Sequence, residues 1–179
     1  MMTSNEKILG ENRRNLLVQT LKAASEPISG TKLGEMANVS RQVIVGDITL
    51  LKAMGEPIMA TSRGYIYLSE VVEQNQFEKT IACLHTSEQT EEELFIFVDH
   101  GVTVKDVKVE HPIYGDLTAS IMVSNRKEAK NFVEHITETN ASLLLELTEG
   151  FHLHTVTANS LEDIEHAEQE LKKAGILIE

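Results

Sequence analysis

The sequence of 179 residues has little cysteine, few basic residues and no long apolar run. A single cysteine excludes an intramolecular disulfide, and Cys83, within the apolar segment TIACL, is predicted to be a core residue rather than a nucleophile. No stretch approaches the roughly 18 apolar residues of a membrane-spanning helix, so we expect no membrane partner. The first residues (MMTSNEKILGENRR) lack the apolar stretch of a signal peptide. These absences predict a cytoplasmic protein.

The shortage of basic residues is uneven along the chain. The formal net charge at pH 7 is −12. Residues 1–70 carry eight Lys or Arg and seven Asp or Glu, a net charge of +1, which leaves −13 for residues 71–179. This asymmetry predicts a near-neutral module joined to an acidic domain with a different task.

Residues 27–68 have the layout of a winged helix-turn-helix. The hydrophobic period predicts one helix over residues 29–37 and a second over 41–54, joined by a tight turn. Ser40 occupies the N-cap position of the second helix, where its hydroxyl can accept a backbone hydrogen bond. An amphipathic helix predicted over residues 5–24 completes a three-helix core.

The outer face of the second helix carries side chains that suit the reading of bases in a major groove. Arginine can pair with guanine and glutamine with adenine, while an apolar group can touch a thymine methyl. The segment PIMATSRGYIYLS predicts a two-stranded wing whose tip can contact phosphates. The predicted DNA-contacting residues are Ser40, Arg41, Gln42, Val45, Thr49 and Arg63. A protein-interaction module with the same core is the alternative interpretation.

A second domain is predicted from Lys79 onward. Residues 71–78 are polar and are interpreted as a linker between domains at residues 1–70 and 79–179. The predicted order of elements is β-α-β-β-α-β-β-α-β, which includes SLLLEL and the final ILIE as strands. Antiparallel strands with helices between them indicate an α+β open sandwich with helices on one face. The predicted fold class is therefore mixed α/β, a winged helix-turn-helix followed by an α+β open-sandwich domain.

Histidines in the second domain form a possible metal site. His152 and His154 are two residues apart on a predicted strand, so both imidazoles project from one face and could bind a metal together. His85 ends another predicted strand and precedes an acidic helix start with glutamates at 91–93. Three imidazoles and one carboxylate would suit Zn, Ni, Fe or Cu. A pair of solvent-exposed histidines on a surface strand is an equally good interpretation of His-x-His alone.

Several segments, taken in order, resemble one family. SRQVIVGDI, RGY, a histidine before an acidic run, VEHPIYGDL and GFHLHT together resemble the niacin-responsive transcriptional repressors of Gram-positive and related bacteria. That family joins a winged helix-turn-helix to a three-histidine domain, and the resemblance covers almost the whole chain. It implies one divalent transition metal per chain (Ni, Zn or Fe), held by His85, Glu93, His152 and His154. It also implies that His111 lies beside the metal ligands and contacts the effector.

The function that the resemblance implies is transcriptional repression of NAD biosynthesis or niacin transport genes, with nicotinic acid as co-repressor. We expect a homodimer on operator DNA, because a near-neutral monomer neutralises few phosphates and binds weakly. One alternative is a repressor for which the metal itself is the effector. Another is a metallohydrolase whose cluster activates water. No H-E-x-x-H signature supports the hydrolase, so we expect no enzymatic activity.

Overall fold

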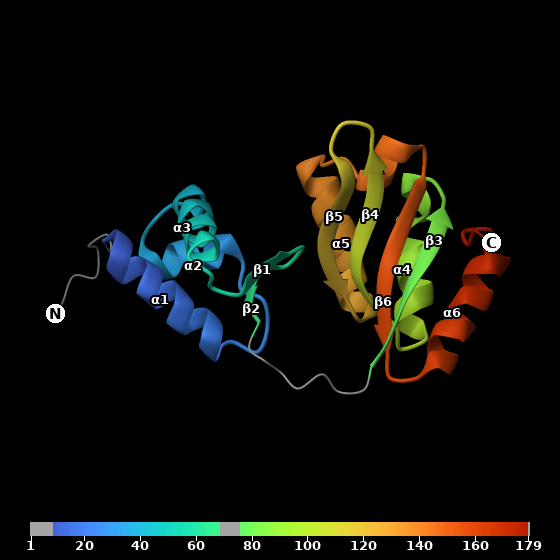
Figure 1. The fold of residues 1–179 in the computed structure, drawn as a ribbon, viewed down its shortest axis with the longest axis horizontal. Helices are drawn as coiled ribbons and strands as arrows, with labels where there is room; N and C mark the ends of the chain where they lie inside the picture. Colours follow the sequence, from blue (N-terminus) through green and yellow to red (C-terminus); the bar gives the residue numbers. More distant parts are fainter. Residues whose placement is uncertain (1–8, 69–75, 179) are drawn as a thin grey trace. The chain divides into compact units, whose positions relative to one another are not determined.

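Residues 9–68 and 76–178 are described by a computed structural model. The chain divides into two units, residues 1–72 and 73–179 (Figure 1). The start of the predicted N-terminal helix and residues 71–75 of the predicted linker lie outside the described residues. None of the described helices is both long and apolar enough to cross a membrane.

The described part of the N-terminal unit consists of three helices and a hairpin. Its elements are α1 (Gly10–Ala23), α2 (Gly30–Ala37), α3 (Arg41–Ala53), β1 (Ile58–Thr61) and β2 (Gly64–Tyr67). They share one apolar core, which contains Leu17, Leu21, Leu33, Ala37, Ile44, Ile48, Leu51 and Ile58. β1 and β2 pair antiparallel, and a bridge from Ile28 to Tyr65 attaches the hairpin to the segment before α2. The predicted winged helix-turn-helix is confirmed.

Local contacts fix the position of α3. A Cβ atom at Gly34 of α2 would lie 2.7 Å from the Val39 carbonyl oxygen, so glycine permits the tight turn between the helices. Ser40 caps α3 as predicted, because its hydroxyl accepts a hydrogen bond from a backbone N–H of the first turn (3.4 Å). A buried ion pair joins Arg13 of α1 to Asp47 of α3 at 2.5 Å. These contacts hold α3 rigidly, with its outer face open.

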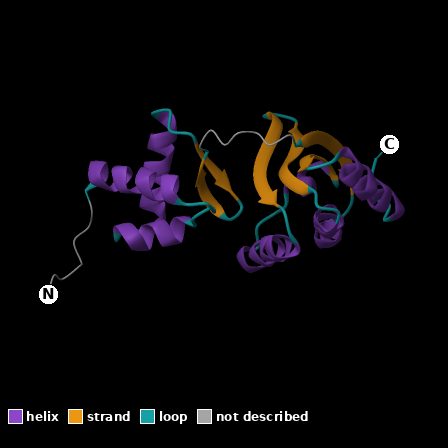
Figure 2. Cartoon of the chain, turned by 90° about the horizontal axis from the view of Figure 1, so that it is seen from below, coloured by secondary structure: helices purple, strands orange, loops and turns teal. Residues whose placement is uncertain are grey.

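The C-terminal unit is an antiparallel sheet with three α-helices on one face (Figure 2). Its elements are β3 (Phe77–Leu84), α4 (Thr90–Asp99), β4 (Thr103–His111), β5 (Gly115–Val123), α5 (Arg126–Thr139), β6 (Phe151–Ala158) and α6 (Leu161–Lys173), with the 3-10 helices η1 (Ser87–Gln89) and η2 (Leu144–Thr148). The strand order β3-β6-β4-β5 makes β6 a central strand. The apolar core, which includes Phe97, Val156 and Leu171, lies between the sheet and the helices. The predicted open sandwich is confirmed.

Three predicted features of this unit are wrong. SLLLEL forms η2 instead of a strand, because three successive leucines have no alternation that distinguishes a strand from a helical turn. In ILIE, the residue Leu177 makes only an isolated bridge with Cys83. β3 begins at Phe77, two residues before the predicted domain start, since Phe77 and Glu78 pair with the end of β6. The described order is therefore β-α-β-β-α-β-α.

Candidate metal centre and nucleic-acid interface

Three imidazoles and one carboxylate meet between β6 and α4. His152 and His154 project from β6, His85 follows β3, and Glu93 projects from α4. The distances from each imidazole Nε2 to the Glu93 carboxylate are 2.8 Å for His85, 3.1 Å for His152 and 3.2 Å for His154. None of the four side chains is more than 4% exposed. The four ligands predicted from the resemblance are thus neighbours in space, although three separate elements or loops supply them.

The backbone holds the other ring nitrogen of each imidazole. Each Nδ1 lies 2.7–2.8 Å from a main-chain carbonyl oxygen. The acceptors are the carbonyl groups of Thr86 for His85, Gly150 for His152 and Asp106 for His154. A carbonyl oxygen can only accept, so Nδ1 carries a proton in each ring, and Nε2 is the nitrogen whose lone pair is free for a metal when the ring is neutral. Imidazoles that bind metals are commonly oriented in this way.

One imidazole nitrogen of the cluster has no hydrogen-bond partner among the described residues. His152 and His154 Nε2 lie at hydrogen-bond distance from Glu93 (3.1 and 3.2 Å). His85 Nε2 is buried, and its 2.8 Å approach to Glu93 lacks the geometry of a hydrogen bond. Two ligand atoms bonded to one ion at about 2.1 Å lie roughly 3.4 Å apart in a tetrahedral site, which is close to the 2.8–3.2 Å found here. The residues therefore fit a divalent transition metal.

The pKa values of the cluster show that the Glu93 carboxylate attracts positive charge. Burial raises the pKa of Glu93, but the charge of His154 and the contacts with all three imidazoles outweigh burial and hold that pKa well below its usual range. Burial lowers the pKa of His85 and of His154, yet the Glu93 carboxylate outweighs it and leaves both raised. The Glu93 carboxyl group is therefore anionic, and protons would compete with a metal for the imidazoles.

Cys83 is a further neighbour of the cluster. The ligand atoms of Cys83, Glu93 and His152 all lie within 4.8 Å of one another. Burial raises the pKa of the Cys83 thiol, and the negative charge of Glu93 raises it further, so the thiol is protonated in the metal-free protein. The imidazoles differ from the thiol in that a backbone carbonyl orients each of them. Cys83 also belongs to the apolar core, as predicted.

Two residues that sequence reasoning missed support the cluster. Gly150 has φ +98°, and a Cβ atom there would lie 2.5 Å from the His85 carbonyl oxygen. Only glycine therefore allows this close approach. The one feature of the sequence that could have indicated this role is the position of Gly150 directly before β6. Thr90 precedes Glu93 by one turn of α4, and its hydroxyl is buried without a hydrogen-bond partner in the described parts of the chain. No sequence signal distinguished Thr90 from a helix-start threonine.

The remaining predicted residues of the C-terminal unit lie as follows. His111 ends β4, and its Nδ1 accepts hydrogen bonds from the backbone N–H groups of Ile113 (3.1 Å) and Tyr114 (3.3 Å). It thus stabilises the β4–β5 turn, and its contact with the effector stays a prediction. The glutamates at 91 and 92 are exposed, so Glu93 alone of the three belongs to the cluster.

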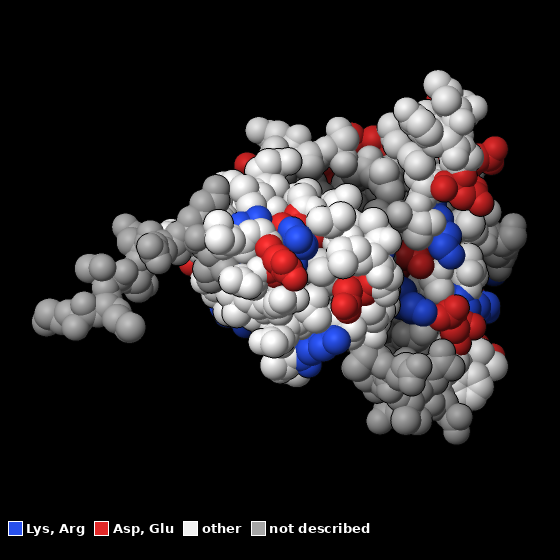
Figure 3. Space-filling view, turned by 60° about the vertical axis from the view of Figure 1, so that its left-hand side comes forward, with Lys and Arg blue, Asp and Glu red and all other residues white. Residues whose placement is uncertain are grey.

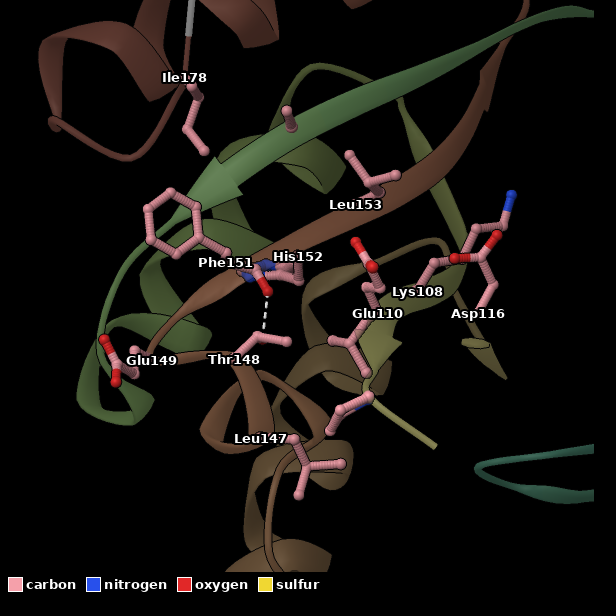
Figure 4. Close-up of a pocket in the computed structure, with 13 residues that line it drawn as sticks. Lys108, Glu110, Asp116, Leu147, Thr148, Glu149, Phe151, His152, Leu153 and Ile178 are labelled. Carbon is pink, nitrogen blue, oxygen red and sulfur yellow. Dashed lines mark hydrogen bonds between the residues drawn. The ribbon is translucent and has the colours of Figure 1, made fainter. Parts of the chain in front are cut away.

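The opposite face of the sheet carries no helix among the described residues of this unit and is partly apolar. Side chains alternate along β6, so Phe151 and Leu153 project away from the imidazoles and are 51% and 40% exposed. A hollow of about 620 Å³ lies on this face. Phe151, Leu153, Ile178, Lys108 and Glu110 are among the residues that line it (Figure 4). A hydrogen bond from the Thr148 hydroxyl to the Phe151 carbonyl oxygen closes one end. β6 therefore carries the cluster on one face and this hollow on the other.

The predicted DNA-contacting residues lie on α3 and in the wing. Arg41, Gln42 and Thr49 are exposed and Val45 is half-buried. Thr49 Oγ1 donates its proton to the Val45 carbonyl oxygen (2.8 Å), so the hydroxyl oxygen is left as an acceptor. Arg63 occupies the turn between β1 and β2 and is half-buried. The outer face of α3 therefore presents exposed side chains that could contact a DNA groove.

Gly46 lies on the same outer face of α3, four residues after Gln42. It is exposed, and a Cβ atom there would meet nothing within 4 Å. Among residues 9–68 and 76–178, therefore, no contact explains a glycine inside this helix.

The charged side chains are mixed on the molecular surface that Figure 3 presents. Lys and Arg are interspersed with Asp and Glu there, without one continuous basic patch.

The fold and the cluster define a winged helix-turn-helix regulator with a second domain that carries a buried histidine–glutamate site. A model of the HTH domain matches residues 13–66, and a model of the 3H domain matches residues 78–179. The chain is 55% identical over 178 residues to the transcription repressor NadR of Bacillus subtilis (strain 168), with 99% of each chain covered. It is 39% identical over 173 residues to the probable transcription repressor NiaR of Thermotoga maritima, with 97% of each covered.

The chain belongs to the 3H-domain family of transcription repressors that includes NadR and NiaR. It also shares 24% identity with an uncharacterised protein of Methanothermus fervidus, over 97% of this chain and 30% of that protein. The two relatives are covered over 99% and 97% of their length and are named a transcription repressor and a probable transcription repressor. With its HTH domain, this chain is therefore a regulator rather than an enzyme. The metallohydrolase alternative is therefore set aside.

Proposed function

We propose that the protein represses genes of NAD biosynthesis or niacin transport and uses nicotinic acid as its co-repressor. The observation that carries the proposed sensing site is the convergence of three imidazole Nε2 atoms on the buried Glu93 carboxylate. The choice of nicotinic acid rests on the resemblance to niacin-responsive repressors. A metal-sensing repressor is the rival function, and the experiments below separate the two.

In this proposal His85, Glu93, His152 and His154 hold one divalent transition metal per chain, of the kind that imidazole prefers, such as Ni, Zn or Fe. The bound metal supplies a Lewis-acid position for a pyridine nitrogen or a carboxylate. The chain itself excludes water by burial and holds each imidazole in one orientation through its Nδ1–carbonyl hydrogen bond. A preorganised site of this kind retains its geometry when the ligand enters.

The N-terminal unit binds operator DNA in this proposal. α3 enters the major groove with Arg41, Gln42, Val45 and Thr49 toward the bases, and Arg63 of the wing contacts phosphates. The sparse positive charge of a single unit argues for a homodimer on a two-fold operator, because two copies double the number of neutralised phosphates. Operator binding places the working protein in the cytoplasm. Nicotinic acid acts by binding the DNA-competent arrangement of the dimer more tightly.

The metal and the effector are tested by binding measurements on the whole chain. Purified protein contains about one divalent ion per chain, and the double variant His152→Ala/His154→Ala contains none. His135→Ala, an exposed histidine of α5, is the matched control and retains the metal. Isothermal titration detects nicotinic acid binding to the metal-loaded protein and none after chelation. Stoichiometric metal in the double variant would overturn the site, and a metal-loaded wild type without affinity for nicotinic acid would favour the metal sensor.

The DNA interface is tested by two arginine variants on an operator fragment. Arg41→Ala costs roughly 1–3 kcal/mol on the operator, because a bidentate contact to a base is lost. Arg63→Ala weakens binding about equally on operator and random DNA, because a phosphate contact carries no sequence information. Arg126→Ala on the C-terminal unit serves as the control. Unchanged affinity in both test variants would contradict the placement of α3 and the wing.

A further inference from the structure

A small cavity lies beside the cluster, on the helix side of the sheet. Its volume is about 30 Å³. Glu93, His152 and His154 form one side, together with Thr90. Apolar side chains from the core, from α5 and from the segment that enters η2 form the rest of the wall. The cavity therefore joins the proposed metal ligands to an apolar space.

Thr90 brings a polar group to this space that the protein itself does not use. The residue is 7% exposed, and its hydroxyl oxygen is buried with no hydrogen-bond partner in the described ranges 9–68 and 76–178. Buried hydroxyl groups are nearly always hydrogen-bonded, because they lose water when they are buried. Thr90 and Glu93 are three residues apart on α4 and so share one face of the helix. An unsatisfied hydroxyl thus lines the same cavity as the cluster.

We propose that this cavity receives the ring of a small pyridine carboxylate, and that the Thr90 hydroxyl donates a hydrogen bond to the ligand carboxylate. The inference rests on the proposed function and adds to it the side chains that recognise the organic ligand. The apolar wall suits the faces of an aromatic ring. The cluster side of the cavity suits the ring nitrogen. Thr90 then distinguishes a pyridine carboxylate from the unsubstituted ring.

The size of the cavity implies that the wall moves when the ligand binds. A volume of about 30 Å³ corresponds to roughly one water molecule, and a six-membered ring is larger. Phe132 of α5 and Leu144 of η2 line the cavity on the side away from the cluster residues of α4 and β6. α5 has a single fully buried residue, Ala129, whereas α4 has four and α6 has three. α5 is therefore the helix whose displacement costs the least packing, and ligand binding favours its displaced position.

The test is the variant Thr90→Val, which removes the hydroxyl and keeps the branched shape. It folds at least as stably as the wild type, because an unsatisfied polar group is replaced by an apolar one. Metal content stays at the wild-type value, while the affinity for nicotinic acid, measured by titration calorimetry, falls about 10–100-fold. Thr90→Ser keeps the hydroxyl and restores most of the affinity. Thr118→Val, at an exposed position of β5, is the matched control and changes neither quantity.

A second ligand separates the carboxylate contact from general damage to the site. Pyridine has the ring nitrogen without the carboxylate, so wild type and Thr90→Val bind it equally. Equal nicotinic acid affinity in wild type and Thr90→Val, or loss of metal from Thr90→Val, overturns the inference and leaves the proposed function intact. A metal-loaded wild type that binds no pyridine carboxylate overturns both.

Discussion

Adding one methyl group at Gly150 perturbs the proposed metal centre without replacing a ligand side chain. At φ +98° a residue with a Cβ atom is strained by about 1–2 kcal/mol. The new Cβ would also lie 2.5 Å from the His85 carbonyl oxygen, and such overpacking typically costs about 1–3 kcal/mol. Gly150→Ala should therefore lower the free energy of unfolding by about 2–5 kcal/mol.

The same change should weaken metal binding, because the Gly150 carbonyl orients His152 and the clash displaces His85. Loss of such supporting contacts typically costs about 10–100-fold in metal affinity. Gly101→Ala is the matched control, since Gly101 has φ +74° and open space around its Cβ position. It should cost about 1–2 kcal/mol of stability and leave metal affinity unchanged. Urea unfolding and competition with a coloured chelator measure both quantities, and equal behaviour of the two variants would refute the reasoning.

The remaining predictions concern Cys83, Gly46 and pH. Cys83→Ala should retain about one metal ion per chain in elemental analysis, whereas loss of the ion would make the thiol a ligand. Gly46→Ala should raise the free energy of unfolding by up to about 1 kcal/mol, because Ala favours the helix, and should weaken operator binding in a gel shift. Unchanged operator affinity would exclude a close approach of DNA at this position. As the pH is lowered, metal affinity should already start to fall before pH 6.5 is reached, because the raised pKa of His85 and of His154 lets protons displace the metal. A pH-independent affinity between pH 8 and 6 would contradict this.

The N-terminal unit was predictable because its signals are local. The N-cap at Ser40 and the apolar stripe of Ile44, Ile48 and Leu51 lie within a few residues of one another, and the structure has both. SLLLEL was not predictable, because a short apolar run fits a strand and a 3-10 helix equally well.

The cluster was predictable only in part. The spacing of His152 and His154 fixes a common face, but Phe151 and Leu153 on the other face are apolar, so the pattern does not show which face is buried. The structure buries the imidazoles, because Glu93 and the backbone carbonyls satisfy their polar atoms. The choice of Glu93 among three glutamates came from the family resemblance. Thr90 is recognised only from its burial and its unsatisfied hydroxyl, which no sequence pattern reports.

The central claim is that nicotinic acid, sensed at the cluster, controls operator binding. Fluorescence anisotropy of an operator fragment, titrated with metal-loaded protein with and without nicotinic acid, measures this directly. The account predicts that nicotinic acid raises the operator affinity about 5–150-fold and that operator DNA raises the nicotinic acid affinity by the same factor. The variant His85→Ala should not respond to nicotinic acid, but it should keep weak basal DNA binding because its helix-turn-helix is intact. An operator affinity that ignores nicotinic acid but changes with metal alone would contradict the claim and identify a metal sensor.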